Sequence, residues 1–278
     1  MVRLLLLGLL LAGCASLPEV GPVEPIPPVR PEREEAFRVV VAGMVSPKEA
    51  HPYRELVRHL WPHAVVFGRR GYGEVLALLR EGSVDVAFLC SLAAGEVVAH
   101  GYGEVVAQSV PAGWTRYRAL AIVPQGSSHR TLGDLVGATV ALVDPLSNTG
   151  RARFFQALRR EGFQPERMFR RMVYTYSHDR AVEAVARGLV DVAAVDGMVL
   201  DTLLRARPEW RNRIRVLWEG PEDPPPPVVV RADLSPAWKA RVIEDLLQAG
   251  DHLLSLGIVG FRPASGKPYA DLWREVRR

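Results

Sequence analysis

The chain has 278 residues, 48% of them hydrophobic, and a formal net charge of +4 at pH 7. This length and apolar content can bury a sizeable core as one large or two smaller domains. The small positive charge, without basic clusters, argues against a nucleic-acid partner.

The first thirteen residues have the pattern of a bacterial signal peptide. Arg3 supplies the positive start, residues 4–11 the apolar run, and Ala12 and Gly13 the small residues of a processing site. The run is shorter than the about 20 apolar residues that span a bilayer. Because Cys14 completes a Leu-Ala-Gly-Cys lipobox, we expect cleavage, acylation of Cys14 and a lipid anchor in the bacterial cell envelope, facing the periplasm or the exterior. An ordinary secreted protein with a chance cysteine is the alternative.

Residues 15–36 predict a tether between this anchor and a folded body. They contain six prolines and show no apolar period, so an extended polyproline conformation is expected. Cys90 is the only other cysteine of the chain. Because a lipidated Cys14 cannot pair with Cys90, no intrachain disulfide is expected.

From residue 37 onward, short apolar runs alternate with amphipathic segments. The pattern predicts strands at residues 38–42, 64–67 and 84–89, with helices at 52–60 and 73–80 between them. Strands separated by a helix imply right-handed crossovers and a mostly parallel sheet.

A second group of elements repeats this order. It predicts strands at residues 139–143, 171–174 and 190–195, with helices at 151–161 and 179–187. In both halves a Val-Asp-Val-Ala segment, starting at Val84 and at Val190, follows a helix that ends at a glycine. Chance similarity of helix-to-strand connections is the alternative. We expect an α/β protein of two similar lobes with a ligand site at their interface.

The chain is expected to cross between the lobes twice. The lobe boundaries are residues 37–116 and 220–278 for lobe I and residues 117–219 for lobe II. Residues 117–123 and 214–217 are the expected crossing segments. After the second crossing, residues 228–230 predict a strand and residues 235–256 a C-terminal helix. The prolines at 224–227 exclude a helix or a central strand there.

Two loops after predicted strands place polar side chains at helix starts. Ser147, Asn148 and Thr149 form one loop, and His178 lies in the other. Unpaired N–H groups and the helix dipole favour an anion at such a start. His178 could donate an N–H, and partial protonation would favour a negative ligand. The alternative is simple helix capping, with His178 as a capping or surface residue.

The loop Asp144-Pro-Leu-Ser-Asn-Thr-Gly150 resembles the corresponding loop of the periplasmic phosphate/phosphite/phosphonate-binding proteins of ABC importers. The resemblance covers roughly residue 37 to the C-terminus. It also includes Thr131-Leu-Gly-Asp-Leu-Val-Gly137, Ser177-His-Asp179, Val190-Asp-Val-Ala-Ala-Val-Asp196, Leu217-Trp218 and Val228-Val-Val-Arg-Ala-Asp-Leu234.

This resemblance implies a two-lobed, hinge-joined periplasmic-binding-protein fold of type II. The protein would bind a phosphonate, phosphite or phosphate between the lobes and deliver it to an ABC permease and its ATPase. The resemblance makes Ser147, Asn148 and Thr149 the oxyanion cradle, His178 a direct donor and Tyr72 the first-lobe residue that closes over the ligand. Tyr72 as a core aromatic residue is the alternative. No cofactor and no enzymatic activity are implied, and we expect a monomer.

The sequence departs from the family pattern in the first lobe and the return turn. Ala94 stands where an aromatic residue is usual, while Ser91 could donate to the ligand or cap a helix. Pro226 stands where an acid usually meets a protonated ligand oxygen. Asp223 or Glu222 could replace that acid only if the turn is displaced.

A third departure concerns the acid that reads an amine on the ligand. Met198 stands at its place, and Asp196 lies near enough to compensate or could be a structural residue. Because such sites select by paired donors and acceptors, these changes leave the identity of the anion open.

Three other functions are alternatives to ligand transport. A hydrolytic triad of Ser147, His178 and Asp196 lacks a Gly-x-Ser-x-Gly elbow. No metal site is expected, because His59 and His63, the one close histidine pair, are separated by a proline. A receptor of the same fold that presents a phosphate or sulfonate to a membrane sensor kinase is the main alternative to transport.

Overall fold

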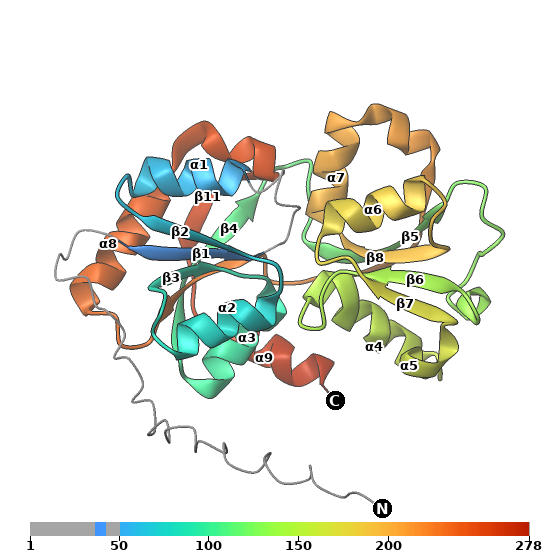
Figure 1. Ribbon diagram of the computed structural model, residues 1–278, viewed down its shortest axis with the longest axis horizontal. Coiled ribbons are helices and arrows are strands. Elements are labelled where there is room, and N and C mark those ends of the chain that lie inside the picture. Colours follow the sequence, from blue (N-terminus) through green and yellow to red (C-terminus); the bar gives the residue numbers. More distant parts are fainter. Residues whose placement is uncertain (1–36, 43–50, 278) are drawn as a thin grey trace, which may run out of the picture. The chain divides into compact units, whose positions relative to one another are not determined.

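The structure is a computed structural model that describes residues 37–42 and 51–277 (Figure 1). The predicted signal peptide, Cys14 and the tether lie outside these residues. Contacts between Cα atoms place all the described residues in one compact unit. No described helix combines the length and the apolar character that a membrane crossing requires.

The first sheet has six strands. Its order is β11 (Ile258–Pro263), β4 (Gly103–Pro111), β10 (Pro227–Arg231), β3 (Val86–Phe88), β1 (Arg38–Ala42) and β2 (Val65–Arg69). The strands β3, β1 and β2 are parallel, as predicted, and β10, β4 and β11 are joined by antiparallel pairing. Strand β1 is apolar from Val39 to Ala42 because helices cover both faces of the sheet.

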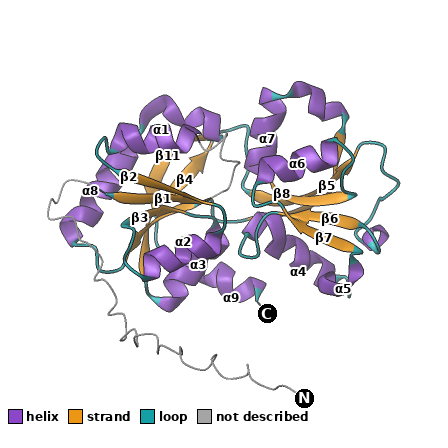
Figure 2. Cartoon of the chain, in the orientation of Figure 1, coloured by secondary structure: helices purple, strands orange, loops and turns teal. Residues whose placement is uncertain are grey.

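Helices cover the six-stranded sheet on its two faces (Figure 2). Helices α1 (His51–Leu60) and α8 (Pro236–Leu247) pack on the face that contains Val39 and Val41. Helices α2 (Tyr72–Arg80), α3 (Ser91–His100) and α9 (Lys267–Val276) pack on the face that contains Val40. The alternation of Val39, Val40 and Val41 between two cores follows from the two-residue period of a strand.

The second sheet has five strands. Its order is β7 (Arg171–Tyr174), β6 (Thr139–Leu142), β8 (Val192–Asp196), β5 (Arg118–Pro124) and β9 (Ile214–Glu222). The strands β7, β6 and β8 are parallel, and β5 pairs antiparallel with β8 and β9. Helices α6 (His178–Ala186) and α7 (Gly197–Ala206) cover one face, and α4 (Arg153–Arg160) and α5 (Pro165–Met168) cover the other.

The repeated Val-Asp-Val-Ala segments perform the same task in the two sheets. Asp85 accepts hydrogen bonds from the backbone N–H and the guanidinium of Arg38, at the start of β1. Asp191 accepts from the backbone N–H of Thr139, at the start of β6, at 2.7 Å. Each aspartate therefore fixes the start of the neighbouring parallel strand.

The predicted crossing segments were wrong in position. Residues 117–123 and 214–217 lie almost entirely in β5 and β9, inside the second sheet. The chain instead passes from β4 to β5 through residues 112–117 and returns from β9 to β10 through residues 223–226.

Two further differences concern the C-terminal part. The predicted helix at 235–256 ends as α8 at Leu247, and a separate 3-10 segment, Gly250–Leu256, starts at a glycine with φ +62°. Pro227 was predicted to lie outside any central strand, yet it begins β10, which lies between β3 and β4. A proline is tolerated there because it is the first residue of the strand.

Candidate functional site

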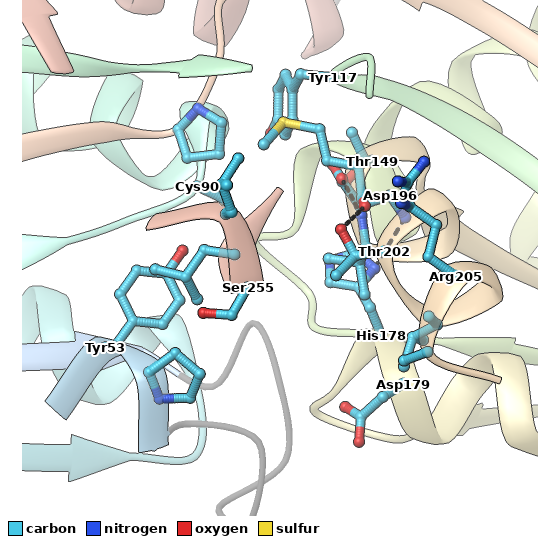
Figure 3. Close-up of a pocket in the computed structure, with 18 of the residues that line it drawn as sticks. Tyr53, Cys90, Tyr117, Thr149, His178, Asp179, Asp196, Thr202, Arg205 and Ser255 are labelled. Atoms are coloured by element: carbon cyan, nitrogen blue, oxygen red, sulfur yellow. Dashed lines mark hydrogen bonds between the residues drawn. The ribbon is translucent and has the colours of Figure 1, made fainter. Parts of the chain in front are cut away.

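A cavity of about 610 Å³ lies between the two sheets and their helices (Figure 3). Cys90 follows β3, Thr149 follows β6, His178 follows β7 and Asp196 ends β8, and all four line the cavity. These residues converge because the carboxyl ends of parallel strands meet at one edge of each sheet.

The loop after β6 is held by its own hydrogen bonds. Ser147 caps the π-helical segment Asn148–Ala152, its Oγ accepting from the backbone N–H of Gly150 at 3.0 Å. A Cβ on Gly150 would lie 2.5 Å from the side chain of Val143, so the loop can pack against β6 only with glycine there. Ser147 is fully buried and does not line the cavity.

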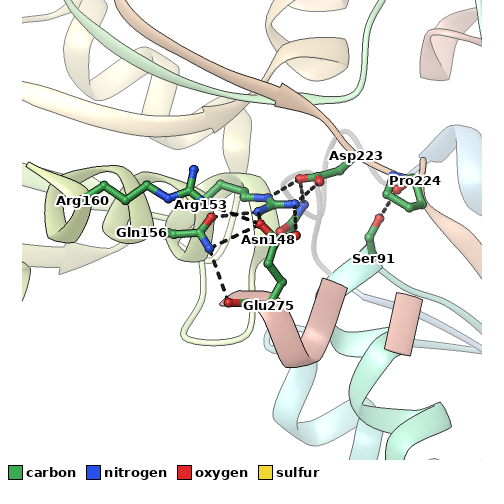
Figure 4. Close-up of polar contacts among 8 residues, drawn as sticks. All are labelled: Ser91, Asn148, Arg153, Gln156, Arg160, Asp223, Pro224 and Glu275. Atoms are coloured by element: carbon green, nitrogen blue, oxygen red, sulfur yellow. Dashed lines mark hydrogen bonds and ion pairs between the residues drawn. The ribbon is translucent and has the colours of Figure 1, made fainter. Parts of the chain in front are cut away.

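Asn148 and Thr149 point to different places. The Asn148 Nδ2 donates to Asp223 Oδ2 at 2.8 Å, away from the cavity lining (Figure 4). Thr149 lines the cavity beside the Asp196 side chain. Of the three residues expected to cradle an oxyanion, the structure brings Thr149 to the cavity wall.

His178 is the first residue of α6 and is buried. Its Nδ1 accepts a hydrogen bond from the backbone N–H of Asp196 at 3.0 Å, so the hydrogen of the neutral ring is on Nε2. Burial lowers the pKa of His178 to about 4. The expectation of a partly protonated ring is therefore wrong, and His178 offers a neutral N–H donor.

Asp196 is a buried carboxyl group at the N-cap of α7. Its Oδ1 accepts from the backbone N–H of Val199 at 3.1 Å, which fixes the start of the helix. Its Oδ2 has no hydrogen-bond partner among the described residues. Burial raises the pKa of Asp196 to about 7.

Two tyrosines line the cavity, one from the start of α2 and one from the connection between β4 and β5. Tyr72 and Tyr117 are 2% and 4% exposed, and in the described part of the chain neither hydroxyl has a hydrogen-bond partner. The backbone N–H of Tyr72 donates to Asp144 Oδ2 at 3.1 Å, which ties α2 to the loop after β6. Burial raises the pKa of both phenols, so they remain neutral donors.

The sequence did not identify Tyr117 as a site residue. It lies directly before β5, in a segment interpreted only as a crossing between lobes. No motif marks it, and its position became apparent only from the packing of the connection against the cavity.

Ser91 is buried and is not among the residues that line the cavity. Its Oγ donates to the carbonyl of Pro224, which joins the start of α3 to the return connection (Figure 4). Its neighbour Cys90 does line the cavity, and burial raises the pKa of the Cys90 thiol to about 11. Ala94 is fully buried within α3.

The acids of the return turn do not replace the missing ligand-reading acid. Asp223 is buried against Arg153, whose Nε donates to its Oδ2 at 2.8 Å. Glu222 forms an exposed ion pair with Arg116. Pro226 does line the cavity, as does Met198, so both departures from the family pattern present apolar surface to a ligand.

The contacts of Ser147, His178 and Asp196 are not those of a hydrolytic triad. The Nδ1 of His178 faces a backbone N–H rather than a carboxylate, and the Oγ of Ser147 caps a helix. A triad histidine instead donates from Nδ1 to the carboxylate. Among the described residues no group of three or more His, Cys, Asp or Glu side chains could hold a metal ion.

Two mixed sheets with a cavity between them give the chain the two-lobed fold of the type II periplasmic binding proteins. Residues 61–269 match the family model of the phosphonate periplasmic substrate-binding proteins of ABC transporters, and the chain belongs to this family. The family provides the substrate-binding component of a transporter, which is not an enzyme.

A curated relative and two solved structures are similar to this chain. The phosphonates-binding periplasmic protein of Escherichia coli (strain K12) is 27% identical over 230 residues, 79% of this chain and 68% of the relative. The binding-protein component of a Pseudomonas aeruginosa ABC phosphonate transporter has a TM-score of 0.77 at 23% identity, covering 88% of this chain and 86% of that one. A Prochlorococcus marinus (MIT 9301) protein in complex with methylphosphonate has a TM-score of 0.74 at 15% identity, covering 87% and 97%. At these identities the two structures show the fold alone.

Proposed function

We propose that this protein binds a phosphonate or a related phosphorus oxyanion in the cavity and delivers it to an ABC permease and its ATPase. The observation that carries the proposal is the convergence of buried neutral donors on one cavity. The hydroxyls of Tyr72 and Tyr117 lack partners among the described residues, and His178 and Thr149 line the same wall. Such groups stabilise an anion oxygen once water is excluded. The names of the E. coli and P. marinus relatives support phosphorus as the central atom.

The proposed contacts divide into two groups. Tyr72, Thr149 and His178 are proposed to donate directly to the oxyanion. Ser147, Asn148 and Ser91 also remain proposed site residues, acting by holding the loop after β6, the return connection and the start of α3 in place.

The volume of the cavity supports an organic substituent on the phosphorus. A water molecule occupies about 30 Å³ of liquid, so a cavity of about 610 Å³ is much larger than a bare oxyanion. Trp114, Met198 and Leu203 provide apolar lining in the same cavity. An alkyl or aryl phosphonate would place its substituent against this surface.

Membrane anchoring through Cys14 is part of the proposal, supported by the lipobox and the proline-rich segment after it. Mass spectrometry of the mature protein should find an acylated N-terminal cysteine at Cys14, and Cys14→Ser should release the protein from the membrane fraction. An unmodified mature N-terminus at another residue would contradict the anchor.

Calorimetric titration of the Cys14→Ser chain tests the ligand class. Methylphosphonate, larger alkyl phosphonates, phosphite and phosphate are compared with sulfate and alkyl sulfonates. We expect the phosphonates to bind most tightly. Binding of the sulfur anions alone would show that the cavity is not a phosphorus-oxyanion site.

Transport is tested in cells that depend on a phosphonate for phosphorus. Deletion of the gene should abolish growth on the phosphonate that binds in vitro, and the wild-type chain should restore it. Unimpaired uptake combined with a lost transcriptional response would favour the sensor alternative.

A further inference from the structure

The unpartnered oxygen of Asp196 is the observation to explain. The side chain is 4% exposed and lines the cavity, and its Oδ2 has no hydrogen-bond donor among the described residues. Leaving a buried carboxyl oxygen without a hydrogen-bond donor is energetically costly. Because this oxygen belongs to a residue of the cavity wall, a ligand hydrogen is the missing partner.

No cation in the described part of the chain forms an ion pair with Asp196. The titratable groups that contact it or act on it electrostatically are His178, Tyr53, Tyr117 and Asp201. Two cations are also relevant: Arg118 lies on the neighbouring strand β5, and Arg205 lines the cavity. The histidine is neutral, both phenols are protonated and Asp201 is an acid. Arg118 pairs with Glu219 at 3.0 Å, and the guanidinium of Arg205 lies over the Trp114 ring.

We propose that Asp196 contacts the ligand and shares one proton with an oxygen of the bound oxyanion, which favours an oxyanion that can itself carry a proton. This inference rests on the proposed function. Asp196, at the end of β8, would supply the carboxyl group that the return turn does not offer to the ligand. In that turn Pro226 has no carboxyl group, and Asp223 is hydrogen-bonded to Arg153 and Asn148.

The chemistry follows from proton counting. A phosphonate monoanion donates its P–OH hydrogen to the ionised carboxylate, whereas a dianion accepts the hydrogen of the neutral carboxyl group. Both routes give the same complex, with one proton between two oxygens. A sulfonate has no exchangeable proton near neutral pH, so it binds well only while Asp196 is protonated. Burial raises the pKa of Asp196 to about 7, so phosphonate and sulfonate binding should begin to differ near neutral pH.

The pH dependence has a definite sign. Above the pKa of Asp196 and the second pKa of the ligand, neither free partner carries the proton, yet the complex needs it. Binding then takes up on the order of one proton, and affinity falls about tenfold for each pH unit.

Calorimetry in two buffers of different ionisation enthalpy measures this uptake. The Cys14→Ser chain is titrated with methylphosphonate and with methanesulfonate between pH 6.5 and 8.5. We expect uptake of about one proton per methylphosphonate at pH 8.5 and almost none for Asp196→Asn. The preference for methylphosphonate at pH 7.5 should fall about tenfold or more in Asp196→Asn, because the amide can donate to either anion.

The variant Asp201→Asn is the matched control. It makes the same chemical change on the same helix, at a residue that does not line the cavity, and should keep the uptake and the preference. Asp196→Asn should fold, because asparagine caps a helix about as well as aspartate. Circular dichroism checks this directly.

Three results would overturn the inference. The first is methylphosphonate binding to the wild type without proton uptake, or with the same uptake in Asp196→Asn. The second is tighter binding of 2-aminoethylphosphonate above pH 7, abolished by Asp196→Asn, which would make Asp196 a reader of ammonium groups. The third is the absence of binding of any phosphorus anion at every pH, which would refute the proposed function as well.

Discussion

His178 shows how a hydrogen bond decides the state of a side chain. The backbone N–H of Asp196 can only donate, so it fixes Nδ1 as an acceptor and leaves the ring hydrogen on Nε2. Burial then lowers the pKa to about 4. Near neutral pH this residue contributes a dipole to the site rather than a positive charge.

Replacing His178 by asparagine should weaken ligand binding without unfolding the protein. The asparagine oxygen can still accept from the Asp196 N–H, but the Nε2–H donor is lost. A hydrogen bond to a charged group contributes about 1.5–3 kcal/mol, so we expect a ten- to hundredfold rise in Kd by calorimetry. The loss should be equal at pH 6 and pH 8. A loss confined to low pH would indicate a charged histidine, and the exposed His100→Asn serves as the control.

The same histidine should make the protein sensitive to acid. Its folded-state pKa of about 4 lies below the ordinary 6.5, so as pH falls from 6.5 to 4 the unfolded chain gains a proton that the folded chain does not. The contribution of His178 to the free energy of unfolding is complete above pH 6.5 and is lost as the pH falls to 4. The loss at pH 4 is on the order of 3 kcal/mol. Asp196, whose pKa is raised, changes the stability in the opposite direction as pH falls, and it does so in the wild type and in His178→Asn alike. Urea unfolding at pH 7 and pH 4.5 should therefore show a smaller loss for His178→Asn; equal losses would contradict the neutral buried ring.

Ser147 and Thr149 should separate folding from binding. Ser147→Ala removes a helix cap, which costs about 1 kcal/mol in urea unfolding. Thr149→Val removes the cavity hydroxyl at nearly constant volume and should raise Kd with a smaller change in stability. If Ser147→Ala raised Kd more than Thr149→Val did, direct contact would belong to Ser147.

At the scale of elements, the loop after β6 depends on close packing. Gly150→Ala would place a methyl group 2.5 Å from Val143 and 2.8 Å from Ser147 Oγ. Overpacking of this kind costs about 1–3 kcal/mol and should also displace Thr149 and raise Kd. The control, Gly73→Ala in α2, meets nothing within 4 Å and should be neutral or stabilising. A Gly150→Ala protein with wild-type stability and Kd would mean that the loop is not rigid.

For the molecule as a whole, Arg153 joins segments far apart in the sequence. From α4 it donates to Asp223 in the return connection and to Glu275 in α9, at 2.6 Å to the latter (Figure 4). The connection at 223–226 is one of two that link the sheets within the described residues. Hinge closure about such connections is the usual motion of this class. The network therefore lies where it can restrain that motion.

Arg153→Met should strongly destabilise the protein, because it leaves Asp223 buried without its cation. Loss of one partner of a buried pair costs about 3–5 kcal/mol, to be measured by urea unfolding. Arg159→Met removes an exposed pair with Glu166 and should cost less than about 1 kcal/mol. Similar losses in the two variants would show that the buried network contributes little.

Much of the fold followed from the sequence because local patterns determine it. The parallel strands at the centre of each sheet could be predicted from two local signals. These are the apolar run of β1 and the glycine that ends the helix before β3 and before β8. The strands β4 and β11 and the helix α9 were not predicted, and β5 and β9 were interpreted as crossings. Their places depend on long-range antiparallel pairing, which leaves no periodic signal in a single segment.

The sequence alone determined the family, the two-half repeat and the position of Thr149 and His178 at helix starts. Only the tertiary structure showed that His178 is neutral and that Asn148 donates to Asp223 rather than lining the cavity. It also showed that Tyr117 and Asp196, with its unpartnered Oδ2, line the cavity. The physical reason is that burial and hydrogen-bond partners, which set pKa values and side-chain directions, come from segments distant in the chain.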